Sequence, residues 1–249
     1  MSDPFRGLSG EELDSIPEKD QPEWTGPMLA VLTHRRFSDE NWIYERKLDG
    51  ERCLVFRKGR SLRILSRNRK ELNDTYPELV DALREADHDF VADGEIVAFE
   101  GNRTSFSRLQ KRMQIRDRKE AERSDVKVTL YLFDILHLAG RETAAGTQRL
   151  RKRLLRRALD FEDPVRYLSH RNETGEATYE EACRKGWEGV IAKEADAAYV
   201  HGRSRHWLKF KCVNRQELVI GGFTDPQRSR EATRRPRPRS DVQTLAPSP

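Results

Sequence analysis

The residues with the clearest potential for chemistry lie around Lys47. This lysine opens a Lys-x-Asp-Gly-x-Arg element that turns at Gly50 and ends at Arg52. A lysine attacks phosphorus only as the free amine, and its deprotonation at pH 7 costs roughly 4–5 kcal/mol from a reference pKa near 10.4. Desolvation, neighbouring cations or a metal ion reduce that cost. The element therefore indicates a covalent nucleophile, although Asp-Gly also marks ordinary strand-to-turn junctions.

Further lysines lie in apolar stretches, where an unpaired ammonium group would be costly. They are Lys193, Lys209 and Lys211. Strand alternation over residues 207–212 places Trp207, Lys209 and Lys211 on one face. Two lysines spaced i, i+2 suit the oxygens of one phosphate group, because a compact point charge is enough there. The alternative is an exposed edge strand.

Carboxylates also occur in apolar strands. In residues 90–99 the same alternation puts Asp93 and Glu95 on one face, and it puts Glu45 on the face of Lys47. Buried carboxylates need a cation, a ligand hydroxyl or a metal ion. A salt bridge to an arginine is the structural alternative, and we favour a ligand role for Glu95.

Glu188 stands directly before the apolar stretch 189–193. It suits Mg²⁺ directly or through water, because that ion takes few carboxylates and adds phosphate oxygens. The combined set offers an amine nucleophile, cations for a phosphate, carboxylates for a ribose or Mg²⁺, and aromatic rings for a base. Phosphoryl-type transfer depends mainly on positioning and charge neutralisation, which this set provides.

The elements that must position these residues are mixed helices and strands without regular βαβ alternation. This pattern predicts a mainly antiparallel α+β fold. Stretches 42–44, 52–56 and 61–65 read as three strands of one antiparallel meander. Residues 149–159 form a helix with a core-facing leucine stripe. We expect its basic residues to form a solvated face: Arg151, Lys152, Arg153, Arg156 and Arg157.

The bulk composition restricts the class of protein. In 249 residues, 36% are charged and the net charge is +5, which describes a moderately basic, non-membrane protein with polyanions as plausible partners. The cysteines Cys53, Cys183 and Cys212 are odd in number and widely spaced, so we expect buried thiols rather than zinc or disulfides. Because residues 1–24 lack an apolar segment, we expect a cytoplasmic, nucleoid-associated protein.

Several motifs in chain order resemble the covalent nucleotidyltransferase superfamily, and most closely an ATP-dependent DNA ligase of the bacterial and archaeal end-joining type. They are Lys47-Leu48-Asp49-Gly50-x-Arg52, Asp93-Gly94-Glu95, Tyr131-Leu132-Phe133-Asp134, Glu188 to Lys193, and Trp207 to Lys211. Two further similar segments are Phe106-x-x-Leu109-Gln110-x-Arg112 and Tyr199-x-x-Gly202-Arg203-Ser204. The resemblance implies an ATP-grasp-like adenylation domain followed by an oligonucleotide-binding (OB) barrel.

The resemblance also implies roles for the residues. Lys47 would attack the α-phosphate of ATP to form lysyl-AMP, and AMP would then pass to the 5′-phosphate of nicked double-stranded DNA. Arg52 and Glu95 would contact the ribose, and Phe133 would stack on adenine. The remaining implied contacts are Glu45 at the base edge, Arg67 at the ribose or nick phosphate, Glu95 and Glu188 at Mg²⁺ or Mn²⁺, and Lys193, Lys209 and Lys211 at the α-phosphate.

The predicted organisation has four parts: a flexible leader at 1–26, the adenylation domain at 27–212, the first OB strand at 213–223 and a disordered basic tail rich in proline and arginine at 224–249. One strand cannot close a barrel. We therefore expect weak nick sealing unless an OB domain or end-joining proteins act in trans, and we expect the chain to be a monomer. The alternatives are an RNA ligase, a capping-type nucleotidyltransferase, or a degenerate remnant that binds nucleotide or DNA without catalysis.

Overall fold

Two β-sheets form the centre of the computed structural model, which describes residues 3–212. The five-stranded sheet has the order β1-β11-β10-β2-β9. Its strands are β1 (Leu29–Leu32), β2 (Trp42–Lys47), β9 (His170–Asn172), β10 (Gly189–Glu194) and β11 (Arg203–Lys211). The six-stranded sheet has the order β4-β3-β5-β7-β8, and β6 pairs with β5. Its strands are β3 (Glu51–Lys58), β4 (Ser61–Ser66), β5 (Phe90–Glu100), β6 (Arg103–Thr104), β7 (Val128–Leu138) and β8 (Val165–Tyr167).

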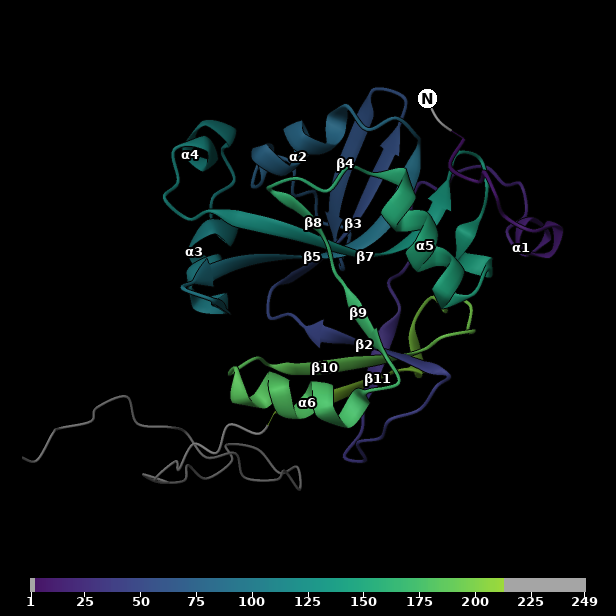
Figure 1. Ribbon diagram of the computed structural model, residues 1–249. Helices are drawn as coiled ribbons and strands as arrows, with labels where there is room; N and C mark the ends of the chain where they lie inside the picture. Colours follow the sequence, from purple (N-terminus) through teal and green to yellow (C-terminus); the bar gives the residue numbers. More distant parts are fainter. Residues whose placement is uncertain (1–2, 213–249) are drawn as a thin grey trace, which may run out of the picture. The chain divides into compact units, whose positions relative to one another are not determined.

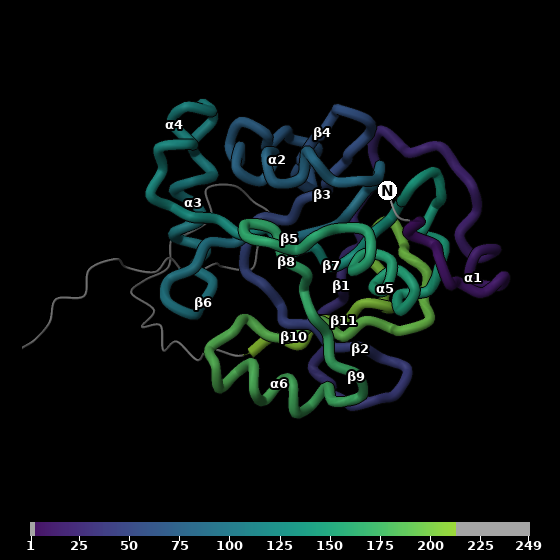
Figure 2. The backbone as a smooth tube through the Cα atoms, turned by 45° about the horizontal axis from the view of Figure 1, so that its top comes forward, coloured from purple at the N-terminus to yellow at the C-terminus, as the bar shows by residue number. Residues whose placement is uncertain are grey.

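Helices cover the outer faces of both sheets. α6 packs on β10 and β2 of the five-stranded sheet, and Figures 1 and 2 both show α2, α3 and α4 on the opposite side of this unit. α5 packs along β7. The helical elements are α1 (Gly10–Asp14), α2 (Pro77–Arg84), α3 (Phe106–Met113), α4 (Arg118–Glu122), the 3₁₀ turn η1 (Thr143–Ala145), α5 (Gln148–Ala158) and α6 (Gly175–Arg184). The mixed, mainly antiparallel architecture confirms the predicted fold class.

Strand alternation divides the apolar residues between separate layers of core. In β3, Cys53 and Val55 belong to the cluster beneath α2 and α5, while Leu54 and Phe56 belong to the cluster between the two sheets. Phe210 of β11 belongs to a third cluster beneath α6. Side chains on the same face of β3 as Leu54 and Phe56 therefore point into the space between the sheets. In β11, the side chains that alternate with Phe210 point into the same space.

The predicted meander is wrong in one respect. β3 and β4 do pair as an antiparallel hairpin, but β2 pairs with β9 and β10 in the other sheet. The turn after Lys47 therefore carries the chain from one sheet to the other. At this crossing a Cβ atom on Gly50 would lie 2.1 Å from the Ile96 carbonyl oxygen, so only glycine fits. Lys47 consequently lies at the junction of the two sheets.

The prediction for α5 is half correct. Its leucines are buried as expected, but Arg151 and Lys152 are buried too, at 0% and 2% exposure. Arg151 donates to both carboxylate oxygens of fully buried Asp134, at 2.7 and 3.1 Å. The sequence pattern predicted a solvated face because it depends on side-chain polarity alone. It contains no information about a buried partner such as Asp134.

The described part of the leader, residues 3–26, corrects the expectation of a flexible segment. Ile16 is fully buried in the core cluster beneath α2 and α5. Backbone hydrogen bonds fix the segment to the loop after β7, from Lys19 N to Gly140 O at 2.9 Å and from Glu142 N to Pro17 O at 2.8 Å. A polar, proline-containing sequence still docks here because Ile16 fills a core position and Phe5 and Leu8 pack against the same cluster.

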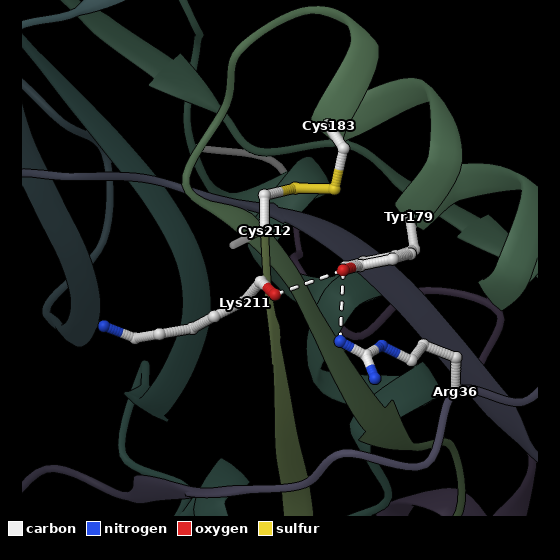
Figure 3. Close-up of a disulfide and its surroundings, with 5 residues drawn as sticks. All are labelled: Arg36, Tyr179, Cys183, Lys211 and Cys212. Atoms are coloured by element: carbon white, nitrogen blue, oxygen red, sulfur yellow. Dashed lines mark hydrogen bonds between the residues drawn. A yellow bond between two sulfur atoms is a disulfide. The ribbon is translucent and has the colours of Figure 1, made fainter. Parts of the chain in front are cut away.

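The cysteine prediction also needs correction. Cys53 is a buried free thiol, as expected, and burial raises its pKa well above the usual value. Cys183 and Cys212, however, form a disulfide that ties α6 to the residue after β11. Figure 3 shows the Tyr179 hydroxyl beside this disulfide, where it donates to the Lys211 carbonyl at 3.2 Å and accepts from Arg36 at 3.1 Å. Residues 29 positions apart in sequence meet only in the fold.

The predicted first OB strand at 213–223 and the basic tail at 224–249 lie outside the described residues. Within residues 3–212, no helix is both long enough and apolar enough to cross a membrane.

Candidate nucleotide-binding site

A cavity of about 250 Å³ opens between the two sheets and contains most of the predicted site. All the predicted site residues except Glu188 and Lys211 line it, and those two contact each other at its mouth. The lining residues from the predicted set are Glu45, Lys47, Arg52, Arg67, Glu95, Phe133, Lys193 and Lys209. A larger cavity of about 860 Å³, between α2, α4 and β8, contains none of them.

Strand register explains why the lysines converge. Lys47 of β2 and Lys211 of β11 both pair with Gly189 of the intervening strand β10. Directly paired residues point to the same face, so both ammonium groups extend over a position that lacks a side chain. Gly189 has φ +148°, and a Cβ atom there would lie 1.9 Å from the Phe210 carbonyl oxygen. Glycine at this position is therefore a requirement of the fold that also opens the site.

Glu188 joins the two lysines at this end of the cavity. Its carboxylate accepts a hydrogen bond from Lys47 Nζ, and its Oε1 lies 3.2 Å from Lys211 Nζ. The pKa of nearby Lys209 is lowered by burial first and then by Lys211 and Lys47. We call Lys47, Glu188, Lys209 and Lys211 the phosphate-end cluster. It concentrates positive charge around the predicted nucleophile, as the sequence required.

The six-stranded sheet supplies the opposite wall. Arg52 donates to both oxygens of fully buried Asp93, at 2.5 and 2.6 Å, and the Tyr199 hydroxyl donates to the same carboxylate at 2.5 Å. Asp93 thus takes the salt bridge that we weighed as the structural alternative for this pair of carboxylates. Among the described residues Glu95 has no such partner, and burial raises its pKa to about 7 despite the opposing charges of Arg52 and Lys47.

Aromatic residues form the deep end of the cavity. The Phe133 and Trp207 rings meet edge to face with centroids 6.2 Å apart. Arg52 lies over the Phe133 ring at 4.4 Å. Aromatic side chains that line a cavity suit a nucleobase.

Lys193 occupies the deep end and not the phosphate end where we had expected it. Its Nζ lies 2.7 Å from Glu45 Oε2 and 4.1 Å from the centre of the Trp207 ring. Burial lowers its pKa to about 8, against the opposing effect of Glu45. The register of β10 accounts for this position, because Lys193 pairs with Trp207, well along the strand from the row of Lys47 and Lys211.

Several lining residues have no predicted contact with a ligand. They include Met28, Leu29, Ala30, Arg46, Leu48, Leu168, Ile191 and Arg203. The alternation that placed Trp207 beside Lys209 also applies to Ile191 and would have found it. Met28 instead reaches the site through tertiary contacts, since its backbone N–H donates to the Tyr199 hydroxyl at 2.7 Å. No local pattern encodes that contact.

The carboxylates suit a cation that keeps several water ligands better than a cation held by protein ligands alone. Within residues 3–212, no cluster of three or more His, Cys, Asp or Glu side chains forms a metal cage. Glu95 and Glu188 are the two carboxylates predicted to hold the ion. One or two carboxylates that leave room for water and phosphate oxygens match the preference of Mg²⁺.

A two-sheet α+β fold with a lysine at the mouth of an aromatic cavity defines the nucleotidyltransferase class of domain. Residues 27–211 match the family described as ATP dependent DNA ligase domain, and the chain belongs to that family. The match does not favour the RNA ligase, capping or remnant alternatives.

Similar proteins include multifunctional end-joining ligases. The multifunctional non-homologous end joining protein LigD of Pseudomonas aeruginosa is 35% identical over 214 residues, which is 84% of this chain and 24% of that protein. The LigD protein of Mycobacterium bovis is 35% identical over 204 residues, 79% of this chain and 25% of that protein. The chain thus spans about a quarter of the length of these relatives.

Solved structures give the same fold. A mycobacterial DNA ligase D complexed with ATP and MES superposes with a TM-score of 0.65 and 31% identity, covering 80% of this chain and 64% of that one. The ligase domain of M. tuberculosis LigD gives a TM-score of 0.62 with 30% identity, covering 75% and 60%.

Proposed function

We propose that this chain is the adenylation domain of an ATP-dependent DNA ligase and that Lys47 is its covalent nucleophile. The main support for this proposal is the position of Lys47 at the mouth of an aromatic cavity, in contact with Glu188 and close to Lys211. In the reaction a bond forms between Lys47 Nζ and the α-phosphorus of ATP. The bond from that phosphorus to the bridging oxygen breaks, and pyrophosphate leaves.

The chain's own groups explain how the reaction could proceed. An ammonium group paired with Glu188 cannot attack, so Lys47 must lose both that contact and its proton. Lys209 and Lys211 disfavour a third positive charge and also suit the α-phosphate oxygens. Mg²⁺ or Mn²⁺, held by Glu95 and Glu188, would supply charge neutralisation at the phosphates. Phe133 would stack on adenine, Glu45 would meet its edge, and Arg52 and Glu95 would contact the ribose.

In the next step AMP passes from Lys47 to the 5′-phosphate of nicked double-stranded DNA, with Arg67 near the ribose or the nick phosphate. For Lys193, the position beside Glu45 supports a role at the base instead of the α-phosphate. The LigD relatives suggest a place in DNA repair by end joining. We further propose that the chain acts in the cytoplasm at the nucleoid, as a monomer, with an OB domain or end-joining proteins contributing to sealing.

The test is the intact mass of the protein after incubation with ATP and Mg²⁺, beside a Lys47→Ala variant. We expect one adenylyl group on the parent protein and none on the variant. Adenylylated protein should then transfer AMP to a nicked DNA duplex in preference to a nicked RNA duplex. If the parent gains no adduct even after bound AMP has been stripped with pyrophosphate, the proposal fails.

A further inference from the structure

Lys152 of α5 contacts Glu45 at the deep end of the cavity, although Lys152 belongs to none of the sequence motifs. Its Nζ donates to Glu45 Oε1 at 2.7 Å and to the Leu168 carbonyl at 2.6 Å, and it lies 4.2 Å from the centre of the Tyr167 ring. Two of the three N–H donors of the ammonium group are thus used in hydrogen bonds, and the ring adds a cation–π contact. Lys152 does not line the cavity itself. Its charge is therefore directed at Glu45 and not at a ligand.

Glu45 is the group that lines the cavity and depends on this contact. Its side chain is only 1% exposed, and burial by itself would raise its pKa and neutralise it. The opposing charges of Lys152 and Lys193 prevail, and the pKa of Glu45 lies below its usual value. Glu45 thus remains a carboxylate inside the protein.

Of the two lysines beside Glu45, Lys152 makes the better-defined contact with its carboxylate. Lys193 Nζ lies 2.7 Å from Glu45 Oε2 but lacks hydrogen-bond geometry, and its pKa is lowered to about 8. His170 pairs with Glu45 across β2 and β9, but burial lowers its pKa as well, so it stays neutral near pH 7. Lys152 instead has two hydrogen bonds that fix both its own position and one oxygen of Glu45.

An ionised carboxylate accepts hydrogen bonds and cannot donate them, whereas a protonated one does both. Adenine presents a 6-amino donor, and guanine presents a 6-oxo acceptor at the same place. A carboxylate at the base edge therefore favours the 6-amino purine and repels the 6-oxo purine, which is discrimination by an unfavourable contact. We infer that Lys152 is a positioning residue that keeps Glu45 ionised and oriented, and thereby sets the preference for ATP over GTP. This inference rests on the proposed function.

The test measures the rate of nucleotidyl-adduct formation with ATP and with GTP, by intact mass, for the parent and for Lys152→Met. We expect the ATP-to-GTP rate ratio to fall about tenfold or more in the variant, since one lost charged hydrogen bond corresponds to at least that factor. Lys152→Arg should recover part of the ratio because it retains the charge. The matched control is Arg153→Met on the same helix, which removes an exposed pair with Glu12 and should leave the ratio unchanged.

The outcomes separate the two proposals. A folded Lys152→Met variant with an unchanged ratio overturns the inference, while a parent that forms no adduct with either nucleotide overturns the proposed function. If Lys152→Met does not fold, the double variant Glu45→Gln with Lys152→Met removes both charges together. It should form adducts with the two nucleotides at rates within a few-fold of each other, and a retained ATP preference would again contradict the inference.

Discussion

The two ends of the cavity use the same chemical components in opposite ways. At each end one glutamate forms salt bridges with two lysines: Glu188 with Lys47 and Lys211, and Glu45 with Lys152 and Lys193. The side chains at the phosphate end are 19–49% exposed, whereas those at the deep end are at most 2% exposed. Composition is therefore shared, and burial is what differs.

Burial decides whether such a cluster can change. Near the surface, water and salt screen the pairs, and each costs little to break. A phosphate or a cation can then replace a protein partner, which a nucleophile needs. In the interior, separating either pair leaves an unpaired buried charge, which is strongly unfavourable. The deep cluster is thus suited to hold one charge state and one geometry.

The largest expected effect is the loss of the reaction on Lys47→Arg substitution. The guanidinium group keeps the positive charge but stays protonated, so it cannot attack phosphorus. We expect ATP still to bind, as seen by protection against thermal unfolding, while no adduct appears in the intact mass. An adduct on the variant would mean that another residue is the nucleophile and that the phosphate-end cluster has a different purpose.

Matched substitutions at the two glutamates test the comparison directly. Glu45→Gln leaves two buried lysines without a counter-charge and should lower the free energy of unfolding by about 3 kcal/mol or more. Glu188→Gln should lower it by less than about 1 kcal/mol because its pairs are partly exposed. The same Glu188→Gln change should slow adduct formation roughly 10- to 100-fold through weaker metal binding. Urea unfolding and intact-mass kinetics measure these effects, and equal destabilisation would break the comparison.

The raised pKa of Glu95 predicts that both the Mg²⁺ requirement and the stability depend on pH. Its pKa is raised to about 7, so the carboxyl group becomes neutral below that pH and loses its ability to hold a cation. The Mg²⁺ concentration needed for half-maximal adduct formation should therefore rise as pH falls through 7. Because this pKa is raised from 4.5 to about 7, stability is lost as pH rises from about 4.5 to 7, and the full loss remains above pH 7. Glu95→Gln should accordingly be more stable than the parent at pH 8 and should flatten the pH dependence of the Mg²⁺ requirement.

The smallest expected effect on the reaction comes from reducing the Cys183–Cys212 disulfide. It closes a 29-residue separation, and its loss should lower the free energy of unfolding by about 3.6 kcal/mol in the chain-entropy description. Cys212 follows Lys211, so reduction should change the adduct-formation rate by a few-fold at most and should leave the ATP-to-GTP ratio intact. Cys183→Ser with Cys212→Ser, unaffected by reductant, is the control. A changed nucleotide ratio would show that the two ends are coupled.

The sequence by itself determined which faces carry chemistry. Alternation in β2, β5 and β11 placed Glu45 with Lys47, Asp93 with Glu95, and Lys209 with Lys211, and each pair lies on the face between the sheets. This works because a strand's side-chain period is fixed at two by backbone geometry. The motif order then identified the family without any contact being known.

Only the tertiary structure decided which cation meets which carboxylate. Lys193 reaches Glu45 through the register of β10, and Lys152 reaches it from α5, more than a hundred positions away along the chain. Likewise, the Asp93 pair with Arg52 and the Cys183–Cys212 disulfide depend on how separate elements pack. Local patterns report the polarity and direction of a side chain, whereas burial and partnership are set by the other elements that close around it.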